Sequence, residues 1–136
     1  MDINAALAHF ESRLEWEIDA ADLHANRDAY IVIDARTPEV FATGHVPGAI
    51  NLPHRTITAE TAQFPKDAVL VTYCDGIGCN ASTKAAVKLS RLGYRVKEMI
   101  GGIDWWRRDG LPVECGGNAA AFKAEALPPH SILCGC

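Results

Sequence analysis

The segment VLVTYCDGIGCN, which runs from Val69 to Asn80, decides the fold of this chain. Its opening run, Val69–Tyr73, is largely apolar and of strand length, which is typical of a strand buried on both faces of a parallel sheet. Cys74 ends this run, and a glycine-containing loop then leads to a helical pattern that begins at Ala81. The sequence therefore predicts a strand, a tight loop and a helix in direct succession.

The same alternation extends in both directions from this segment. Other runs of strand character are Trp16–Ile18, Tyr30–Ile33 and Val96–Ile100. Helices are expected at Ala20–Arg27, at Pro38–Ala42 as a single turn, from Ala81 to Leu92 and from Gly101 to Arg107. Strands that alternate with helices predict an α/β fold, with an open sheet and helices on both of its faces.

Length and composition predict a single domain, because the chain has 136 residues and 49% of them are hydrophobic. Near the N-terminus four apolar residues fall at helical spacing, namely Ile3, Leu7, Phe10 and Leu14. We therefore expect residues 1–14 to form an amphipathic helix packed on the flank of the domain. Residues 15–113 should form the domain itself, and residues 114–136 a tail that ends in Cys134-Gly-Cys136.

Charge and hydropathy exclude several classes of partner. The chain has 13 basic and 17 acidic residues, a net charge of -4, and no run of Lys or Arg, so we expect no nucleic acid partner. No segment approaches membrane-spanning length, and the N-terminus lacks a basic start followed by an apolar stretch. We therefore expect a cytoplasmic protein without a membrane partner.

The cysteines favour reactive thiols over a disulfide framework, because their number, 5, is odd. Cys115 best fits the alternative of a small buried apolar residue. Cys74 stands where a strand ends and a glycine loop leads into a helix, a geometry that turns backbone N–H groups and the positive end of a helix toward one point. We expect the Cys74 thiol to ionise readily there, and the same groups to hold a persulfide anion.

From about residue 15 to residue 113 the chain resembles the rhodanese-like family. The motifs that carry the resemblance are Asp34-Ala-Arg36, Glu39, Gly44-His-Val-Pro-Gly-Ala-Ile-Asn51, Tyr73-Cys74, Ala85-Ala86, Leu92-Gly-Tyr94, Gly101-Gly102, Trp106 and Gly110-Leu-Pro-Val113. The resemblance implies one domain with a five-stranded parallel sheet flanked by helices. It also implies a sulfurtransferase that carries sulfane sulfur as a persulfide on Cys74, without a bound cofactor or metal. Its partners would be a small sulfur donor, thiosulfate or another sulfane compound, and a thiol acceptor, which includes a protein thiol.

The loop after Cys74 departs from the usual family pattern. We expect it to bind the substrate through Asp75, Gly76, Ile77, Gly78 and Asn80. Asp75, Cys79 and Asn80 stand in neighbourhoods where a typical rhodanese loop has basic residues, so thiosulfate is expected to be a poor substrate. The loop is also about two residues longer than usual when the helix is aligned, and it resembles a subset with a Cys-x4-Cys-Asn loop.

Several assignments stay open at the level of sequence. Cys79 is either a spectator or a thiol that resolves Cys74 by disulfide exchange, which would make the protein a thiol-disulfide redox enzyme. Cys134 and Cys136 form a mobile dithiol arm, an incidental tail, or with His130 an incomplete metal site. A non-catalytic binding module is the remaining alternative.

Supporting roles are expected for residues outside the loop. Asp34 and Arg36 should form an ion pair that orders the loops, and His45 should bind nearby backbone. Of the adjacent Trp105 and Trp106, one should lie in the core and the other at the rim of the site. Candidate cations of the pocket are His54, Arg55 and Lys84.

Overall fold

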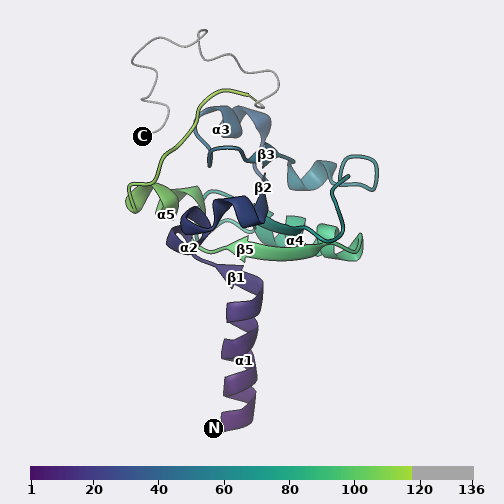
Figure 1. The fold of residues 1–136 in the computed structure, drawn as a ribbon, viewed down its shortest axis with the longest axis vertical. Coiled ribbons are helices and arrows are strands. Elements are labelled where there is room, and N and C mark those ends of the chain that lie inside the picture. The colour runs from purple at the N-terminus through teal and green to yellow at the C-terminus, as the bar shows by residue number, and fades with distance from the viewer. Residues whose placement is uncertain (118–136) are drawn as a thin grey trace.

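The computed structural model describes residues 1–117, which form one α/β domain with an N-terminal helix (Figure 1). Its strands are β1 (Glu17–Ile18), β2 (Tyr30–Asp34), β3 (Ile50–Asn51), β4 (Val69–Tyr73) and β5 (Arg95–Met99). Its α-helices are α1 (Ile3–Trp16), α2 (Ala20–Ala25), α3 (Pro38–Ala42), α4 (Ala81–Arg91) and α5 (Gly102–Arg108). The predicted elements are therefore present, with their ends shifted by a few residues.

The sheet has five parallel strands in the order β1-β5-β4-β2-β3, which confirms the predicted fold class. The central strand β4 pairs with β2 on one side and β5 on the other. Because β4 ends at Tyr73, Cys74 lies at the carboxyl edge of the middle of the sheet. This is the edge at which open α/β sheets place their ligands.

Two apolar cores lie on opposite faces of the sheet, because successive side chains of each strand alternate between them. Val71 and Tyr73 pack on one face with Leu23 of α2 and Trp106 of α5. Leu70 packs on the other face with residues of α4 and of the segment between β3 and β4, among them Leu52, Ile57, Ala85 and Leu89. Helices on both faces thus hold the carboxyl edge of β4 in place.

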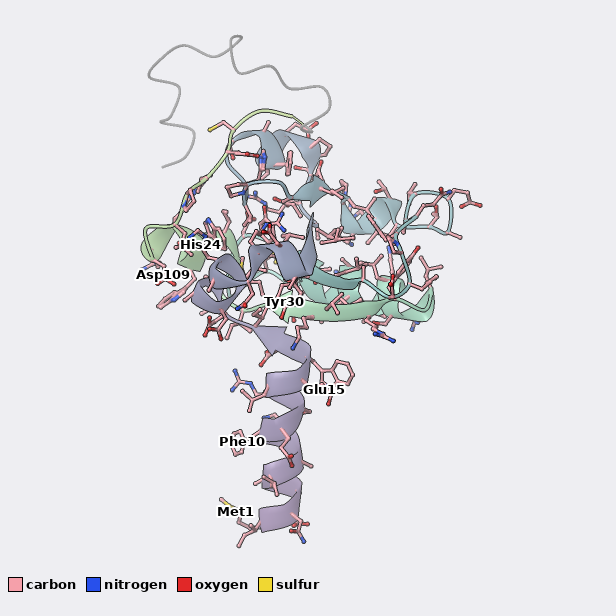
Figure 2. All side chains as sticks on the ribbon, in the orientation of Figure 1. Met1, Phe10, Glu15, His24, Tyr30 and Asp109 are labelled. Atoms are coloured by element: carbon pink, nitrogen blue, oxygen red, sulfur yellow. The ribbon has the colours of Figure 1, made fainter. Side chains whose placement is uncertain are left out.

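Helix α1 forms as predicted, but it does not pack on the flank of the domain. None of its residues is buried, and the helix projects away from the sheet (Figure 1). Phe10 remains 59% exposed, and Met1 and Phe10 lie along a stretch of helix that no other element flanks (Figure 2). Helical spacing of apolar residues predicts a helix from local preference alone, whereas packing depends on a partner surface that this part of the domain does not supply.

Candidate active site

A cavity of about 490 Å³ opens at the carboxyl edge of the sheet, where β4 and β5 end. Side chains that line it include Arg13, Cys74, Cys79, Ser82, Glu98 and Trp105. They come from α1, the loop after β4, the first turn of α4, β5 and α5. The tertiary fold thus gathers residues that are widely separated in the sequence.

Cys74 lies at the base of this cavity and is 2% exposed. Its thiol is 3.2 Å from the carbonyl oxygen of Cys79 and 3.3 Å from the hydroxyl oxygen of Ser82. The backbone N–H of Ser82 is also directed at the sulfur. This N–H belongs to the first turn of α4, whose N-cap residue Asn80 makes no side-chain capping bond. The sulfur therefore takes one of the N–H groups that a helix start leaves unpaired.

The expectation that Cys74 ionises readily was wrong. Burial raises the pKa of the Cys74 thiol, and the hydrogen bond with Cys79 raises it further, while the backbone N–H of Ser82 only partly opposes this. Burial disfavours a charged thiolate, and a single helix N–H does not compensate for the lost water. The Cys74 thiolate is therefore less favoured than the thiolate of an ordinary cysteine.

Cys79 behaves in the opposite way. Burial raises the pKa of its thiol, but hydrogen bonds from the Cys74 thiol and from the backbone N–H groups of Ala81 and Asp75 outweigh burial and lower the pKa. The two sulfurs are therefore not equivalent. Of the pair, Cys79 carries the negative charge more easily, and Cys74 donates to it.

Ser82 and Glu98 form a chain of polar contacts that begins at the Cys74 sulfur. The Ser82 hydroxyl donates to the Glu98 carboxylate at 2.5 Å, and the Thr83 hydroxyl donates to the same oxygen at 2.7 Å. Glu98 reaches this position because it is the register partner of Thr72 on β4, next to the strand that leads to Cys74. Sequence reasoning missed both Ser82 and Glu98. The available signal was a carboxylate inside the strand that is neighbour to the cysteine-bearing strand.

The start of α5 fixes the backbone of the loop. The N–H groups of Ile103 and Asp104 donate to the carbonyl oxygens of Cys74 and Asp75, both at 2.9 Å. Gly102 has a φ of 58°, and a β-carbon at this position would overlap the Cys74 carbonyl oxygen. Glycine at position 102 is therefore required both by backbone conformation and by space.

The comparisons with known proteins agree with this geometry. Residues 18–109 match the family described as Rhodanese-like domain. This chain belongs to that family. The matched segment contains the whole sheet except Glu17 of β1, together with Cys74 and α5 up to Arg108.

Two relatives and one solved structure illustrate the likeness. A protein named Sulfurtransferase from Allochromatium vinosum is 38% identical over 101 residues, which cover 71% of this chain and 92% of that protein. An HTH-type transcriptional regulator of Mycobacterium tuberculosis is 35% identical over 118 residues, 85% of this chain and 52% of the regulator, so this chain spans about half the length of that relative. A crystal structure of a Bacillus halodurans protein has a TM-score of 0.80 and 38% identity, and the match covers 91% of this chain and 96% of that one.

The predicted loop residues form two groups, those that line the cavity and those that do not. Gly76, Ile77 and Cys79 line the cavity with Cys74, whereas Asp75, Gly78 and Asn80 do not. Asp75 turns instead toward Arg36, whose Nη1 lies 3.4 Å from its carboxylate. The sequence predicted that Asp75 binds the substrate. In the structure its side chain faces Arg36 and does not line the cavity.

Arg36 and Asp34 form the ion pair that the sequence predicted, at 2.7 Å and almost fully buried. Burial lowers the pKa of Arg36, but its hydrogen bonds to Asp34 and the charge of that carboxylate outweigh burial and raise the pKa, so the guanidinium stays charged. Arg36 also donates to the carbonyl oxygen of Gly44 at 2.6 Å. Asp34 and Arg36 thus connect three loops, and neither residue lines the cavity.

His45 has the structural place that was expected. Its Nδ1 lies 2.9 Å from the carbonyl oxygen of Phe41, and its ring stacks on the Phe41 ring with 3.6 Å between centroids. Glu114 lies 3.4 Å from its Nε2 and also pairs with its backbone. His45 is not a lining residue of the cavity.

The remaining candidates are the two tryptophans, the three cations and the residues near the C-terminus. Trp106 is 1% exposed in the core while Trp105 is 46% exposed and lines the cavity, as predicted for one of each. None of the three candidate cations, His54, Arg55 and Lys84, lines the cavity, and Arg13 of α1 does. Cys134, Cys136 and His130 lie outside the described residues.

Two further findings concern residues 1–117 alone. No helix in this range is long and apolar enough to cross a membrane. Nor does this range contain a group of His, Cys, Asp or Glu side chains that could hold a metal ion.

Proposed function

We propose that this rhodanese-like domain is a sulfurtransferase that carries sulfane sulfur on Cys74. In the first half-reaction the Cys74 thiol loses its proton to solvent, and the thiolate attacks the outer sulfur of a donor R–S–SH. An S–S bond forms between the Cys74 sulfur and the outer sulfur, the S–S bond of the donor breaks, and the released R–S⁻ takes up a proton. In the second half-reaction an acceptor thiolate removes the outer sulfur and regenerates Cys74.

The observation that carries this proposal is the position of the Cys74 sulfur. It lies at the base of a cavity, with the Ser82 N–H of the α4 start directed at it and with the loop backbone fixed by α5. A persulfide extends one sulfur further into that cavity. Its anion would be stabilised by the start of α4. Sulfurtransferases among the relatives support the same reaction class.

Intact mass after incubation with a sulfane donor tests the proposal directly. We expect a gain of about 32 Da, the mass of one sulfur atom, located on Cys74 by peptide mapping and lost in Cys74→Ser. Cys79→Ser is the matched control, since it removes the neighbouring thiol and keeps Cys74. Sulfur addition that persists in Cys74→Ser would contradict the proposal. No addition to the wild-type protein from any donor would favour a non-catalytic binding module.

A second candidate function follows from the contact between the two loop thiols. Because the Cys74 thiol lowers the pKa of Cys79, the Cys79 thiolate forms more easily than that of an ordinary cysteine. Attack of that thiolate on an oxidised or persulfidated Cys74 would form a disulfide and release water or sulfide. A loss of about 2 Da, mapped to a Cys74–Cys79 peptide pair and absent in Cys79→Ser, would identify this thiol-disulfide chemistry.

A further inference from the structure

The Ser82 hydroxyl has a single proton, and Glu98 holds it. At 2.5 Å the Glu98 carboxylate accepts from Ser82, so the Ser82 oxygen faces the Cys74 sulfur, 3.3 Å away, with its lone pairs. A lone pair directed at the sulfur repels a thiolate more strongly than a neutral thiol. As long as Glu98 is a free carboxylate, Ser82 therefore stabilises the thiol form of Cys74.

The charges around the cavity act in the same direction. Its lining contains one arginine, Arg13, and two carboxylates, Asp19 and Glu98, for a net formal charge of -1. Arg13 is bound to Glu17 at 2.7 Å, and Glu17 is the register partner of Glu98 on β1. The remaining charged groups that share a groove with Glu98 are Lys97, which donates to backbone carbonyls of α1, and Arg91 at the end of α4. No cation therefore makes a hydrogen bond or ion pair with the Glu98 carboxylate among residues 1–117.

We propose that Glu98, acting partly through the Ser82 hydroxyl, determines which sulfur donors react with Cys74, and that it selects donors with a positively charged group over anionic donors. The substrate named in this inference rests on the proposed function. Its test does not, because the test requires no persulfide. An ammonium group near the sulfane sulfur would pair with the Glu98 carboxylate. Ser82 would then turn its O–H toward Cys74 and stabilise the thiolate, which displaces R–S⁻ from R–S–SH.

A dianionic donor meets the opposite conditions. Thiosulfate would add negative charge beside Glu98 and Asp19 and leave the Ser82 hydroxyl donating to the Glu98 carboxylate. Like charges in a site partly shielded from water repel more strongly than in bulk solvent. From the sequence, poor use of thiosulfate is expected because of Asp75, Cys79 and Asn80. The proposal attributes it instead to Glu98, which lines the cavity.

Methanethiosulfonate reagents of different charge provide the probe. In each, the Cys74 thiolate attacks the sulfenyl sulfur, forms Cys74–S–S–R and releases methanesulfinate, so the bond changes are identical. We would compare reagents whose R group is aminoethyl, methyl and sulfonatoethyl, and follow Cys74 by peptide mass. For the wild-type protein the rate should fall in the order cation, neutral, anion, with about a tenfold span or more between the two charged reagents.

Glu98→Gln should change both the order and the pKa. Relative to the neutral reagent, the cationic reagent should lose its advantage and the anionic reagent its penalty. The pKa of Cys74 should fall, because a like charge is removed and the neutral amide oxygen competes less strongly than the carboxylate for the Ser82 proton. Glu60→Gln makes the same chemical change at an exposed position far from the cavity lining and should leave the rate ratios unaltered.

A double-mutant cycle tests the route through Ser82. In the Ser82→Ala background Glu98→Gln should lower the Cys74 pKa by less than in the wild type, since only the direct charge effect remains. An equal pKa change in both backgrounds would overturn the Ser82 part. Unaltered charge ratios in Glu98→Gln would overturn the whole inference. If the wild-type protein shows this charge selection but forms no persulfide with any donor, the proposed function alone is contradicted.

Discussion

The α-carbon of Gly102 packs against the carbonyl oxygen of Cys74 so closely that no β-carbon fits between them. The contact arises because the first N–H groups of α5 point at the loop backbone and donate to Cys74 and Asp75. Gly102 of the Gly101-Gly102 motif is therefore explained by its approach to the loop after β4, whereas a β-carbon at Gly101 would meet Trp105. These hydrogen bonds from α5 hold the Cys74–Asp75 and Asp75–Gly76 peptide bonds in one orientation.

Gly102→Ala should destabilise the domain and disturb the loop. We expect a loss of about 3 kcal/mol in the free energy of unfolding, from a left-handed backbone and from the overlap with Cys74. Chemical denaturation measures it. Gly110→Ala is the matched control, because Gly110 also has a positive φ, 73°, but has open space around its α-carbon. It should lose only about 1 kcal/mol. Equal losses in the two variants would show that the overlap with Cys74 has no cost.

The buried ion pair of Arg36 and Asp34 leads to a second prediction. Arg36→Met leaves the Asp34 carboxylate buried without its partner, which should cost about 3–5 kcal/mol of unfolding free energy. Arg36→Lys should recover only part of this, because an ammonium cannot reproduce the paired hydrogen bonds to Asp34. The control is Arg108→Lys, which alters an exposed pair with Asp104 and should change stability by less than about 0.5 kcal/mol. A small effect at Arg36 would refute the supporting role.

Most of the fold could be predicted from the sequence because its signals are local. The apolar run Val69–Tyr73 and the helical stripe after Ala81 each specify their element without reference to the rest of the chain, and strand-helix alternation then specifies the layers. The packing of α1 could not be predicted in this way. Its apolar spacing is the same whether or not another surface covers it.

The position of Cys74 could be predicted from the sequence, but the electrostatics around it could not. A strand end, a glycine loop and a helix start locate Cys74, yet the direction of its pKa shift depends on burial and on Ser82 and Glu98, which reach it across two elements. The orientation of Asp75 likewise depends on Arg36, which lies 39 positions earlier in the chain. Contacts of this kind follow from strand order and register, which a local pattern does not contain.

Asp75 provides a test that separates the sequence interpretation from the structural one. If Asp75 repels thiosulfate, as its position after Cys74 first indicated, then Asp75→Arg should raise activity with thiosulfate more than with an uncharged donor. Because Asp75 faces Arg36 and does not line the cavity, we expect equal effects on both donors. Initial rates with thiosulfate and with an uncharged persulfide donor decide between them. A selective gain with thiosulfate would restore the role of Asp75.

The C-terminal cysteines make a further prediction that comes from the sequence alone. If Cys134 and Cys136 receive sulfur from Cys74 or resolve it by exchange, removing residues 131–136 should leave persulfide formation on Cys74 intact. Turnover with an external thiol should fall, because a tethered dithiol acts at an effective concentration on the order of millimolar. Persulfide is measured by mass and turnover by sulfide release. Unchanged turnover in the truncated protein would leave the two cysteines without this role.

The opposite pKa shifts of the two loop thiols predict the order in which they react as the pH rises. A raised pKa means that the Cys74 thiolate appears at higher pH than for an ordinary thiol, and a lowered pKa means that the Cys79 thiolate appears at lower pH. Labelling with iodoacetamide between about pH 6 and pH 10, resolved by peptide mass, should therefore modify Cys79 first. In Cys79→Ser the thiol that raises the Cys74 pKa is lost, so Cys74 should become reactive at a lower pH than in the wild type. In Cys74→Ser the pKa of Cys79 should change as well, since the Cys74 thiol that donates to it is gone. Modification of Cys74 before Cys79 in the wild-type protein would show that the helix start outweighs burial after all.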